Sequence, residues 1–431
     1  MLETHIVRLG THAEKDYLLR AYAWFDDVLL NANLVEAGAA SLGIFLTKLR
    51  DKDKQYFIDP MTYAFALPPY LLMRRGVVIP SRAYLKRTFL GLAQQYGKVV
   101  NEHAGERALQ PDHFISDADK EEFCLNVLNY QKEKLTEDLR ASEYFLMAEV
   151  IPLVPKRLVA PYFHLSGDME WLDINIELAN IACRIEPAVW VGVCLDSLLL
   201  YSDESLEDIV GRYTQVPTCG YLLWATDFNE NRATERQIHG LRRLVNELSQ
   251  AGTKPVINMF GGYFSCLLAQ YGLTGISHGL GYGEKRDIEP VLGGGLPPAK
   301  YYLPAIHKDI RLDQFVAIAQ GLDNLSFPQH VCDCVICKGL LRQGIDSLII
   351  QYTDSTFKLV NNRLREVATQ QVYRLTRFHY LNNKHLEFQK LRRSKHIDLL
   401  DELDSGYQNF RNQLGTPSLM YLRTWKRALS S

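Results

Sequence analysis

Short apolar runs rich in β-branched and aromatic residues recur along this chain, and most are separated by segments long enough for a helix. Eight such runs lie at residues 27–33, 55–59, 157–163, 188–194, 220–225, 255–260, 273–277 and 300–306. Amphipathic helical patterns lie between several of them, and the pattern at 235–251 ends at Gly252, just before the next run. Repeated strand, helix and strand units predict a parallel sheet, and eight such strands predict a (β/α)8 TIM barrel.

The composition is that of an ordinary globular protein. The chain has 431 residues, of which 47% are hydrophobic and 23% are charged, so it exceeds the usual size of one hydrophobic core. It contains no run of about 18 uncharged apolar residues, and its N-terminus lacks the parts of a secretory signal. We therefore expect a cytoplasmic protein with no membrane partner. The net charge of -2 neither indicates nor excludes a nucleic-acid partner.

Three of the eight cysteines lie within six residues, with the spacing Cys332-x-Cys334-x-x-Cys337. Structural zinc sites take four such ligands in a tetrahedron, so a fourth ligand must come from elsewhere in the chain. The candidates are His379 and His385, which would face different ways on a helix, and we favour His379. Three cysteines and one histidine leave no open position, so the Zn2+ ion is expected to be structural and not catalytic.

Three parts follow from these patterns. Residues 1–327 are expected to form the barrel, with a mostly helical insertion at about 74–147. Residues 328–397 are expected to form a basic, zinc-binding helical subdomain, and residues 398–431 a helical tail. The predicted fold class is therefore α/β, a TIM barrel with a helical insertion and a C-terminal zinc-binding subdomain.

Polar and aromatic residues follow many of the expected strands. The carboxyl ends of barrel strands converge on one opening, where a mixture of rings, amides and carboxylates suits a flat polar ligand such as a nucleobase. A polar rim is also common to barrels in general. The base-binding candidates are Phe163, His164, Asp196, Trp224 and Asn258.

An eight-stranded barrel followed by Cys-x-Cys-x-x-Cys and a later histidine resembles the tRNA-guanine transglycosylase family, including its relatives that put 7-deazaguanine bases into DNA. The resemblance extends from about Asp27 to Arg393 and implies that Cys332, Cys334, Cys337 and His379 close a structural zinc site. It also matches Tyr56-Phe-Ile-Asp-Pro with the family's strand that ends in an aspartate beside the bound base. This match implies a catalytic role for Asp59, although Asp followed by Pro is also a common helix start.

The match fails at residues 272–284. The family's covalent nucleophile is an aspartate at the end of a late strand, where this chain carries Ser277 or His278 and no carboxylate before Glu284. Base exchange needs such a nucleophile to hold the sugar. We therefore expect hydrolysis, in which Asp59 activates water or stabilises the sugar cation and His278 assists the departing base.

The expected enzyme is thus a DNA glycosylase that removes a modified base, as in defence against phage. The family's base-reading aspartate is also missing, which implies a different base. Two alternatives stay open. One is a transglycosylase in which Glu284 or Asp287 replaces the missing aspartate, and the other is a catalytically inert binding subunit.

Basic residues collect between residues 363 and 395, which hold nine Lys or Arg against two Glu. A local basic face can neutralise a polyanion, whereas a solvated helix face is the plain alternative, and the resemblance favours nucleic acid. DNA is preferred over RNA because no separate RNA-binding domain follows the cysteine region, and a homodimer is also considered. The backbone-contact candidates are Arg374, Arg377, Lys390, Arg392 and Arg393.

Overall fold

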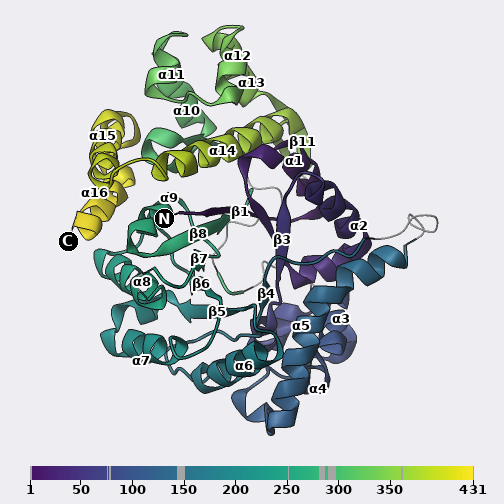
Figure 1. The fold of residues 1–431 in the computed structure, drawn as a ribbon. Helices are drawn as coiled ribbons and strands as arrows, with labels where there is room; N and C mark the ends of the chain where they lie inside the picture. The colour runs from purple at the N-terminus through teal and green to yellow at the C-terminus, as the bar shows by residue number, and fades with distance from the viewer. Residues whose placement is uncertain are drawn as a thin grey trace.

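The expected α/β barrel is confirmed in the computed structural model, which describes residues 2–74, 76, 79–142, 151–250, 252–280, 287–289, 298–360 and 363–430. Eight parallel strands form one sheet in the order β3-β2-β1-β8-β7-β6-β5-β4 (Figure 1). They are β1 (Thr4–Arg8), β2 (Asp27–Asn31), β3 (Gln55–Asp59), β4 (Leu158–Val159), β5 (Val189–Asp196), β6 (Gly220–Thr226), β7 (Val256–Asn258) and β8 (Leu273–His278). A single bridge between Phe57 and Arg157 joins β3 to β4, so the ring nearly closes.

The sequence prediction misplaced one strand. It missed β1, which pairs with both β2 and β8, and it assigned residues 300–306 to the barrel. In the structure, β9 (Lys300–Leu303) instead pairs antiparallel with β10 (Lys308–Arg311), outside the barrel. The strand β1 escaped notice because His5 and Arg8 are polar, although both side chains are buried.

Helices cover the outer face of the strands, and local capping explains where several begin. These helices are α2 (Ala32–Arg50), α6 (Leu172–Ile185), α7 (Asp203–Tyr213), α8 (Glu235–Leu248) and α9 (Tyr263–Leu267). The Asn31 side chain accepts the Leu34 amide at the start of α2, and the Thr234 side chain accepts the Gln237 amide at the start of α8. Because side chains alternate along each strand, one set fills the barrel interior while the other packs on these helices.

The expected helical insertion is present between β3 and β4. It contains α3 (Arg87–Tyr96), α4 (Lys98–His103) and α5 (Asp117–Arg140). The side-chain amide of Gln131 on α5 donates to the Val159 carbonyl at 2.8 Å, and its oxygen accepts the Val159 amide at 2.9 Å. The insertion thus satisfies the backbone of the short strand β4, where the ring is weakest.

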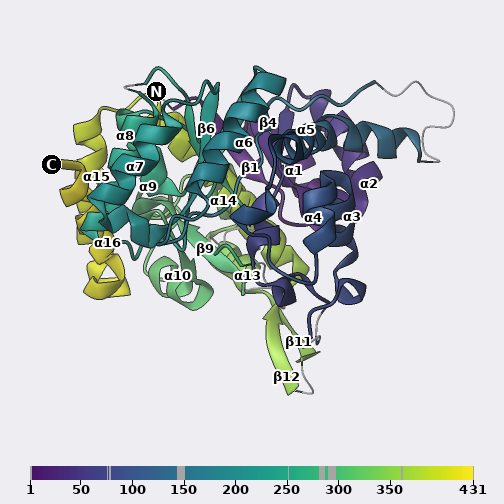
Figure 2. The same ribbon diagram turned by 90° about the horizontal axis from the view of Figure 1, so that it is seen from below.

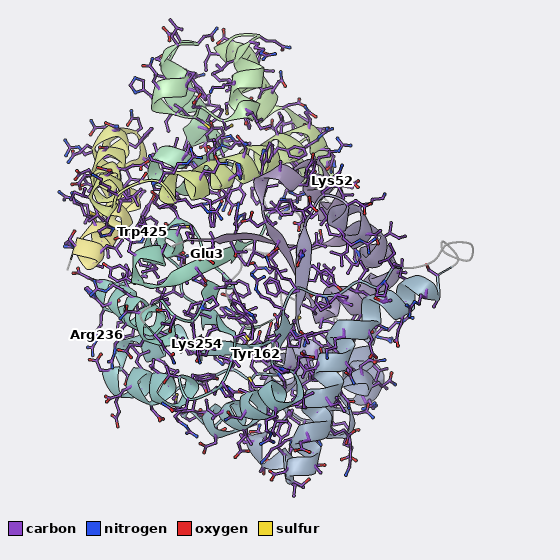
Figure 3. The ribbon with its side chains drawn as sticks, viewed as in Figure 1. Glu3, Lys52, Tyr162, Arg236, Lys254 and Trp425 are labelled. Carbon is purple, nitrogen blue, oxygen red and sulfur yellow. The ribbon has the colours of Figure 1, made fainter. Side chains whose placement is uncertain are left out.

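The C-terminal region is helical and packs against one side of the barrel (Figure 1). Its elements are α10 (Leu312–Ala319), α11 (Ser326–His330), α12 (Val335–Leu341), α13 (Ile345–Thr353), β11 (Ser355–Val360), β12 (Arg363–Ala368), α14 (Gln370–Leu391), α15 (His396–Leu414) and α16 (Thr416–Ser430). The indole of Trp425 on α16, labelled in Figure 3, donates to the Glu230 carbonyl at 2.8 Å. The expected tail is therefore two helices joined to the barrel. None of the helices in the described part of the chain has the length and apolar content needed to cross a membrane.

Candidate functional site

Cys332, Cys334, Cys337 and His379 meet in one buried cluster, with one ligand atom from each lying within 4.8 Å of all the others. The Nδ1 atom of His379 lies 3.3, 3.4 and 3.9 Å from the sulfurs of Cys334, Cys337 and Cys332 respectively. Tetrahedral zinc with bonds of about 2.3 Å to sulfur and about 2.0 Å to nitrogen would place these atoms about 3.6 Å apart. The four residues therefore fit a metal ion, with zinc as the natural occupant.

The surroundings of the cluster support a metal site. The Nε2 atom of His379 lies 2.7 Å from the Tyr302 carbonyl on β9, and this contact orients the ring so that Nδ1 faces the cysteines. The amides of Cys334 and Cys337 donate to cysteine sulfurs at 3.4 Å, as expected around thiolate ligands. His385, the other candidate, instead contacts Gln389 through Nε2 at 2.8 Å. The structure thus brings His379, and not His385, to the three cysteines.

Asp59 ends β3 inside the mouth of the barrel, with 4% of its surface exposed. Its Oδ1 atom accepts hydrogen bonds from the Tyr162 hydroxyl at 2.8 Å and from the Met61 amide at 2.9 Å, whereas no described residue donates to Oδ2. Burial raises the pKa of Asp59 to about 6, although these hydrogen bonds and the charge of Arg8 act to lower it. The carboxyl has one fixed oxygen and one open oxygen, and it titrates near neutral pH, as a proton-exchanging group should.

The short helical turn after β3 and the strand β5 hold Tyr162 against Asp59. The hydroxyl of Thr62, three residues after Asp59, donates to the Tyr162 carbonyl at 2.6 Å and accepts its amide at 2.8 Å. The Tyr162 ring fills the space beside Gly192 on β5, where a Cβ atom would come within 2.5 Å of the ring. Any larger residue at position 192 would therefore displace the tyrosine from the carboxylate. Sequence reasoning did not find Tyr162, because no local pattern marks its contact with Asp59.

Aromatic rings surround the mouth beside this carboxyl. The Tyr63 ring lies 5.7 Å from the Tyr162 ring and 5.1 Å from the Trp224 ring at the end of β6, centroid to centroid. Trp224 in turn stacks on Phe260 at 4.5 Å. The guanidinium of Arg8, at the end of β1, lies 3.9 Å from the centroid of the Phe260 ring. Trp224 is only 2% exposed and packs between Tyr63 and Phe260, so its contact with a base stays a prediction.

His278 and Ser277 end β8, but the structure contradicts the catalytic roles expected for them. The Ser277 side chain points into the barrel interior, level with Ile6, and is fully buried. The Nε2 atom of His278 lies 2.7 Å from Nε2 of His5, and its Nδ1 atom lies 3.1 Å from the Gly279 carbonyl. Burial lowers the pKa of His278 to about 3, so the ring is neutral at neutral pH and cannot protonate a departing base.

Two predicted base-binding residues point away from the mouth. Phe163 is fully buried and stacks on Trp171 of the outer layer, with the ring centroids 3.9 Å apart. The Asn258 side chain donates to the Ser265 hydroxyl on α9 at 2.9 Å. Both predictions are wrong, because one step along a strand reverses the direction of a side chain.

His164 and Asp196 lie nearer to the mouth, where each already has a partner. The Nε2 atom of His164 lies 3.0 Å from the Thr226 hydroxyl at the end of β6. The carboxyl of Asp196 accepts the Leu198 amide at 2.8 Å and so begins the turn after β5. Both remain predicted ligand contacts.

A cavity of about 880 Å3 opens between the barrel mouth and the C-terminal region, a size that suits a nucleotide-sized ligand. Arg8 and Phe260 line it on the barrel side, so it adjoins the rings around Asp59. Lys300 and Lys308 of the β9–β10 pair and Lys384 of α14 line the opposite side. The mouth therefore continues into a space whose walls carry both cations and carboxylates, since Glu230 and Asp309 line it as well.

A pair of carboxyl groups also faces this cavity. Asp227 follows β6 with a φ of 58°, and both Asp227 and Asp287 line the cavity wall. Burial and the hydrogen-bonded carboxyl of Asp287 raise the pKa of Asp227 to about 6, so Asp227 holds its proton more tightly than an ordinary carboxyl does. Asp287 is one of the two carboxylates considered as a replacement nucleophile. Glu284, the other, lies outside the described residues.

Sequence reasoning also missed a buried ion pair on α14. The ammonium of Lys384 lies 3.0 Å from the Glu387 carboxylate, which also accepts the Tyr302 hydroxyl at 2.8 Å and contacts His307 Nδ1 at 2.7 Å. Although burial opposes ionisation, Lys384 and these hydrogen bonds lower the pKa of Glu387 to about 2. The pair ties α14 to β9 and β10 at the cavity wall. Its spacing of three residues within one helix was the available signal.

The predicted basic face is partly used within the molecule. Arg392 donates to the backbone carbonyls of Leu2 and Glu3, and Lys390 pairs with Glu402 at 2.6 Å. These contacts hold α14 to the start of β1 and to α15. Arg374 and Arg393 are exposed and Arg377 is half-buried, and their binding to a nucleic-acid backbone stays a prediction.

Fold and cluster together define a class of protein, an α/β barrel with a Cys3His cluster that could hold a metal ion in a C-terminal helical region. No model of a known protein family matches this sequence, and no curated protein matches it either. The function therefore has to be argued from the geometry of the site.

Proposed function

We propose that this protein cleaves the N-glycosidic bond of a base in nucleic acid, DNA in preference to RNA, by hydrolysis. The observation that carries the proposal is Asp59, whose Oδ1 atom is fixed by Tyr162 and Met61 while Oδ2 stays open. It lies at the carboxyl end of a barrel strand, the usual place for barrel chemistry, near a cavity that the ring of Phe260 lines. The resemblance to tRNA-guanine transglycosylases in the cysteine motif and around Asp59 supports the same reading.

In the proposed reaction, the bond from the sugar C1′ atom to the base breaks and its electron pair leaves with the base. A water oxygen bonds to C1′, and the Oδ2 atom of Asp59 takes the water proton. With a pKa of about 6, the carboxyl is mostly ionised at pH 7 and is still basic enough to accept this proton. The positive charge of Arg8 lies beside the same mouth and favours a departing base that carries negative charge.

The metal in this proposal is zinc, held by Cys332, Cys334, Cys337 and His379. All four positions of a tetrahedron are filled by protein, so the ion would supply no Lewis-acid chemistry and would only fix α12 against α14. Because α14 also carries the Lys384–Glu387 pair at the cavity wall, a bound metal would influence the site only through the position of that helix.

One observation favours base exchange as a second candidate. Asp227 and Asp287 bring a carboxyl pair to the cavity, and Asp287 follows β8, near the place where the family carries its nucleophile. A carboxylate there could hold the sugar while one base replaces another.

The two reactions are separated by incubating nucleic acid with a radiolabelled 7-deazaguanine base. Hydrolysis predicts abasic sites without incorporated label, and it predicts loss of product in Asp59→Asn but not in Asp287→Asn. Exchange predicts incorporated label and loss of product in both variants. Incorporation of label would overturn the hydrolytic proposal.

A further inference from the structure

A two-stranded hairpin, β11 and β12, stands away from the body of the protein between α13 and α14 (Figure 2). Six residue pairs form its ladder, from Ser355 with Ala368 to Val360 with Arg363. Among the strands that the structure describes, these two pair only with each other and belong to no larger sheet. A two-stranded hairpin of this kind gains little stability by itself, so its exposed faces need another explanation.

The register sorts the side chains of the hairpin onto two different faces. Phe357 lies on one face together with Leu359 and Leu364, which are directly opposite each other. These three side chains are 66%, 71% and 69% exposed. Lys358, Arg363 and Arg365 lie on the other face and are also exposed. One face therefore carries three apolar side chains beside Glu366, which is directly opposite Phe357, and the other face carries three cations.

The cationic face places like charges against each other. Lys358 and Arg365 are direct partners across the ladder, and Arg363 is two residues further along the same face. Like charges opposite each other destabilise a strand pair. Among the described residues, none of the three makes an ion pair with a carboxylate, since Glu366 lies on the other face and bonds to the Ser355 hydroxyl. An anionic partner would relieve this repulsion.

We propose that the β11–β12 hairpin docks on duplex DNA, with Lys358, Arg363 and Arg365 on backbone phosphates and with Phe357, Leu359 and Leu364 against the bases. The charge of the cationic face complements a polyanion, and apolar side chains that enter a groove can unstack base steps. Helix α14 follows β12 after one residue and carries the exposed Arg374 in its second turn, which adds a cation close to the hairpin in sequence. Unstacking would expose a base for the barrel mouth, and this part of the inference rests on the proposed function. The binding of duplex DNA by the hairpin does not depend on it.

The test measures binding of a fluorescein-labelled DNA duplex by anisotropy over a range of salt concentrations, in an Asp59→Asn background so that no reaction intervenes. One variant carries Lys358→Gln, Arg363→Gln and Arg365→Gln. Its matched control removes three exposed cations on other elements, through Lys52→Gln, Arg236→Gln and Arg411→Gln. A second variant carries Phe357→Ser, Leu359→Ser and Leu364→Ser, and 2-aminopurine in the duplex reports unstacking.

The cationic variant is expected to bind the duplex roughly 10-fold or more weakly than the wild type. The slope of its log affinity against log salt concentration should be smaller in magnitude by about 2 to 3, while the control keeps the wild-type slope. The apolar variant is expected to keep this slope and lose the 2-aminopurine signal. Unchanged binding in the cationic variant, or an equal loss in its control, would overturn the inference. Three other results would also overturn it, each with unchanged binding to duplex DNA. The hairpin variants could alter the oligomeric mass, the binding to anionic lipid vesicles or the binding to duplex RNA instead.

Failure of the hairpin and failure of the proposed function give different results. A protein that binds duplex DNA through the hairpin but releases no base keeps this inference and loses the glycosidase proposal. A protein that releases bases equally well in wild type and in both hairpin variants keeps the glycosidase proposal and loses this inference.

Discussion

Replacing Asp59 by asparagine is expected to stabilise the folded protein while abolishing the proposed activity. The buried carboxyl has a pKa of about 6, against an ordinary value of 3.8. The folded state binds the proton of Asp59 more tightly than the unfolded state does, so this proton stabilises the folded wild type. That stabilisation is complete below pH 3.8 and is lost as the pH rises through 6. Asparagine carries no charge at any pH and escapes that loss.

The size of the effect follows from the pKa difference of about 2 units, each worth about 1.4 kcal/mol. This difference sets an upper limit on the gain in the free energy of unfolding of Asp59→Asn over the wild type. The limit is about 3 kcal/mol at pH 8 and about 1.6 kcal/mol at pH 5. Unfolding entropy of about 2.1 cal/mol/K per residue converts 3 kcal/mol into a rise in Tm of about 3 °C for a chain of 431 residues.

Thermal unfolding of the wild type and of Asp59→Asn, measured from pH 5 to pH 8, checks this prediction. The difference in Tm should grow as the pH rises. Asp51→Asn, which replaces an exposed carboxyl at the end of α2, serves as the control and should show no such growth. A variant at Asp59 that is less stable at every pH, or whose difference from wild type is the same at pH 5 and pH 8, would refute the reasoning.

Three further predictions concern the groups around the site. Tyr162→Phe removes a hydrogen bond that lowers the pKa of Asp59, so the acidic limb of the pH–rate profile should move to higher pH, and an unmoved limb would contradict this coupling. His379→Ala should lower the zinc content measured by elemental analysis to well below one equivalent while His385→Ala keeps it, and equal zinc in both would refute the ligand assignment. The stabilisation from ionised Glu387, about 3 kcal/mol, is present above pH 4.5 and is lost as the pH falls through 2. Glu387→Gln should therefore lower the free energy of unfolding in urea at pH 7 by about 3 kcal/mol, whereas a loss below about 1 kcal/mol would mean that Lys384 finds another partner.

The barrel was predictable because most of its strands are apolar runs separated by helical segments. This alternation can be recognised even when the predicted ends of the strands and helices are wrong by a few residues. The exceptions have physical causes. The strand β1 carries buried His5 and Arg8, which find partners in His278 and in the Met259 carbonyl, and such contacts leave no trace in a local pattern. Residues 300–306 are strand-like in composition, but they pair with β10, and composition does not state a partner.

The Cys3His cluster was largely predictable because three of its members are close in sequence, whereas helical geometry indicated only that His379 and His385 would not both join them. The mouth was harder to predict. Asp59 was found from its neighbours in sequence, whereas Tyr162 reaches it from another strand and only because Gly192 leaves room. Phe163 was misplaced because a shift of one residue turns a strand side chain from the mouth to the outer layer.

Mass spectrometry of the small molecules released from modified phage DNA tests the central claim most directly. The account predicts that the wild-type protein releases a free base and leaves an abasic site, and that Asp59→Asn releases none although it binds the same DNA. A wild-type protein that binds the DNA and releases no base, or an Asp59→Asn variant that releases as much base as the wild type, would contradict it.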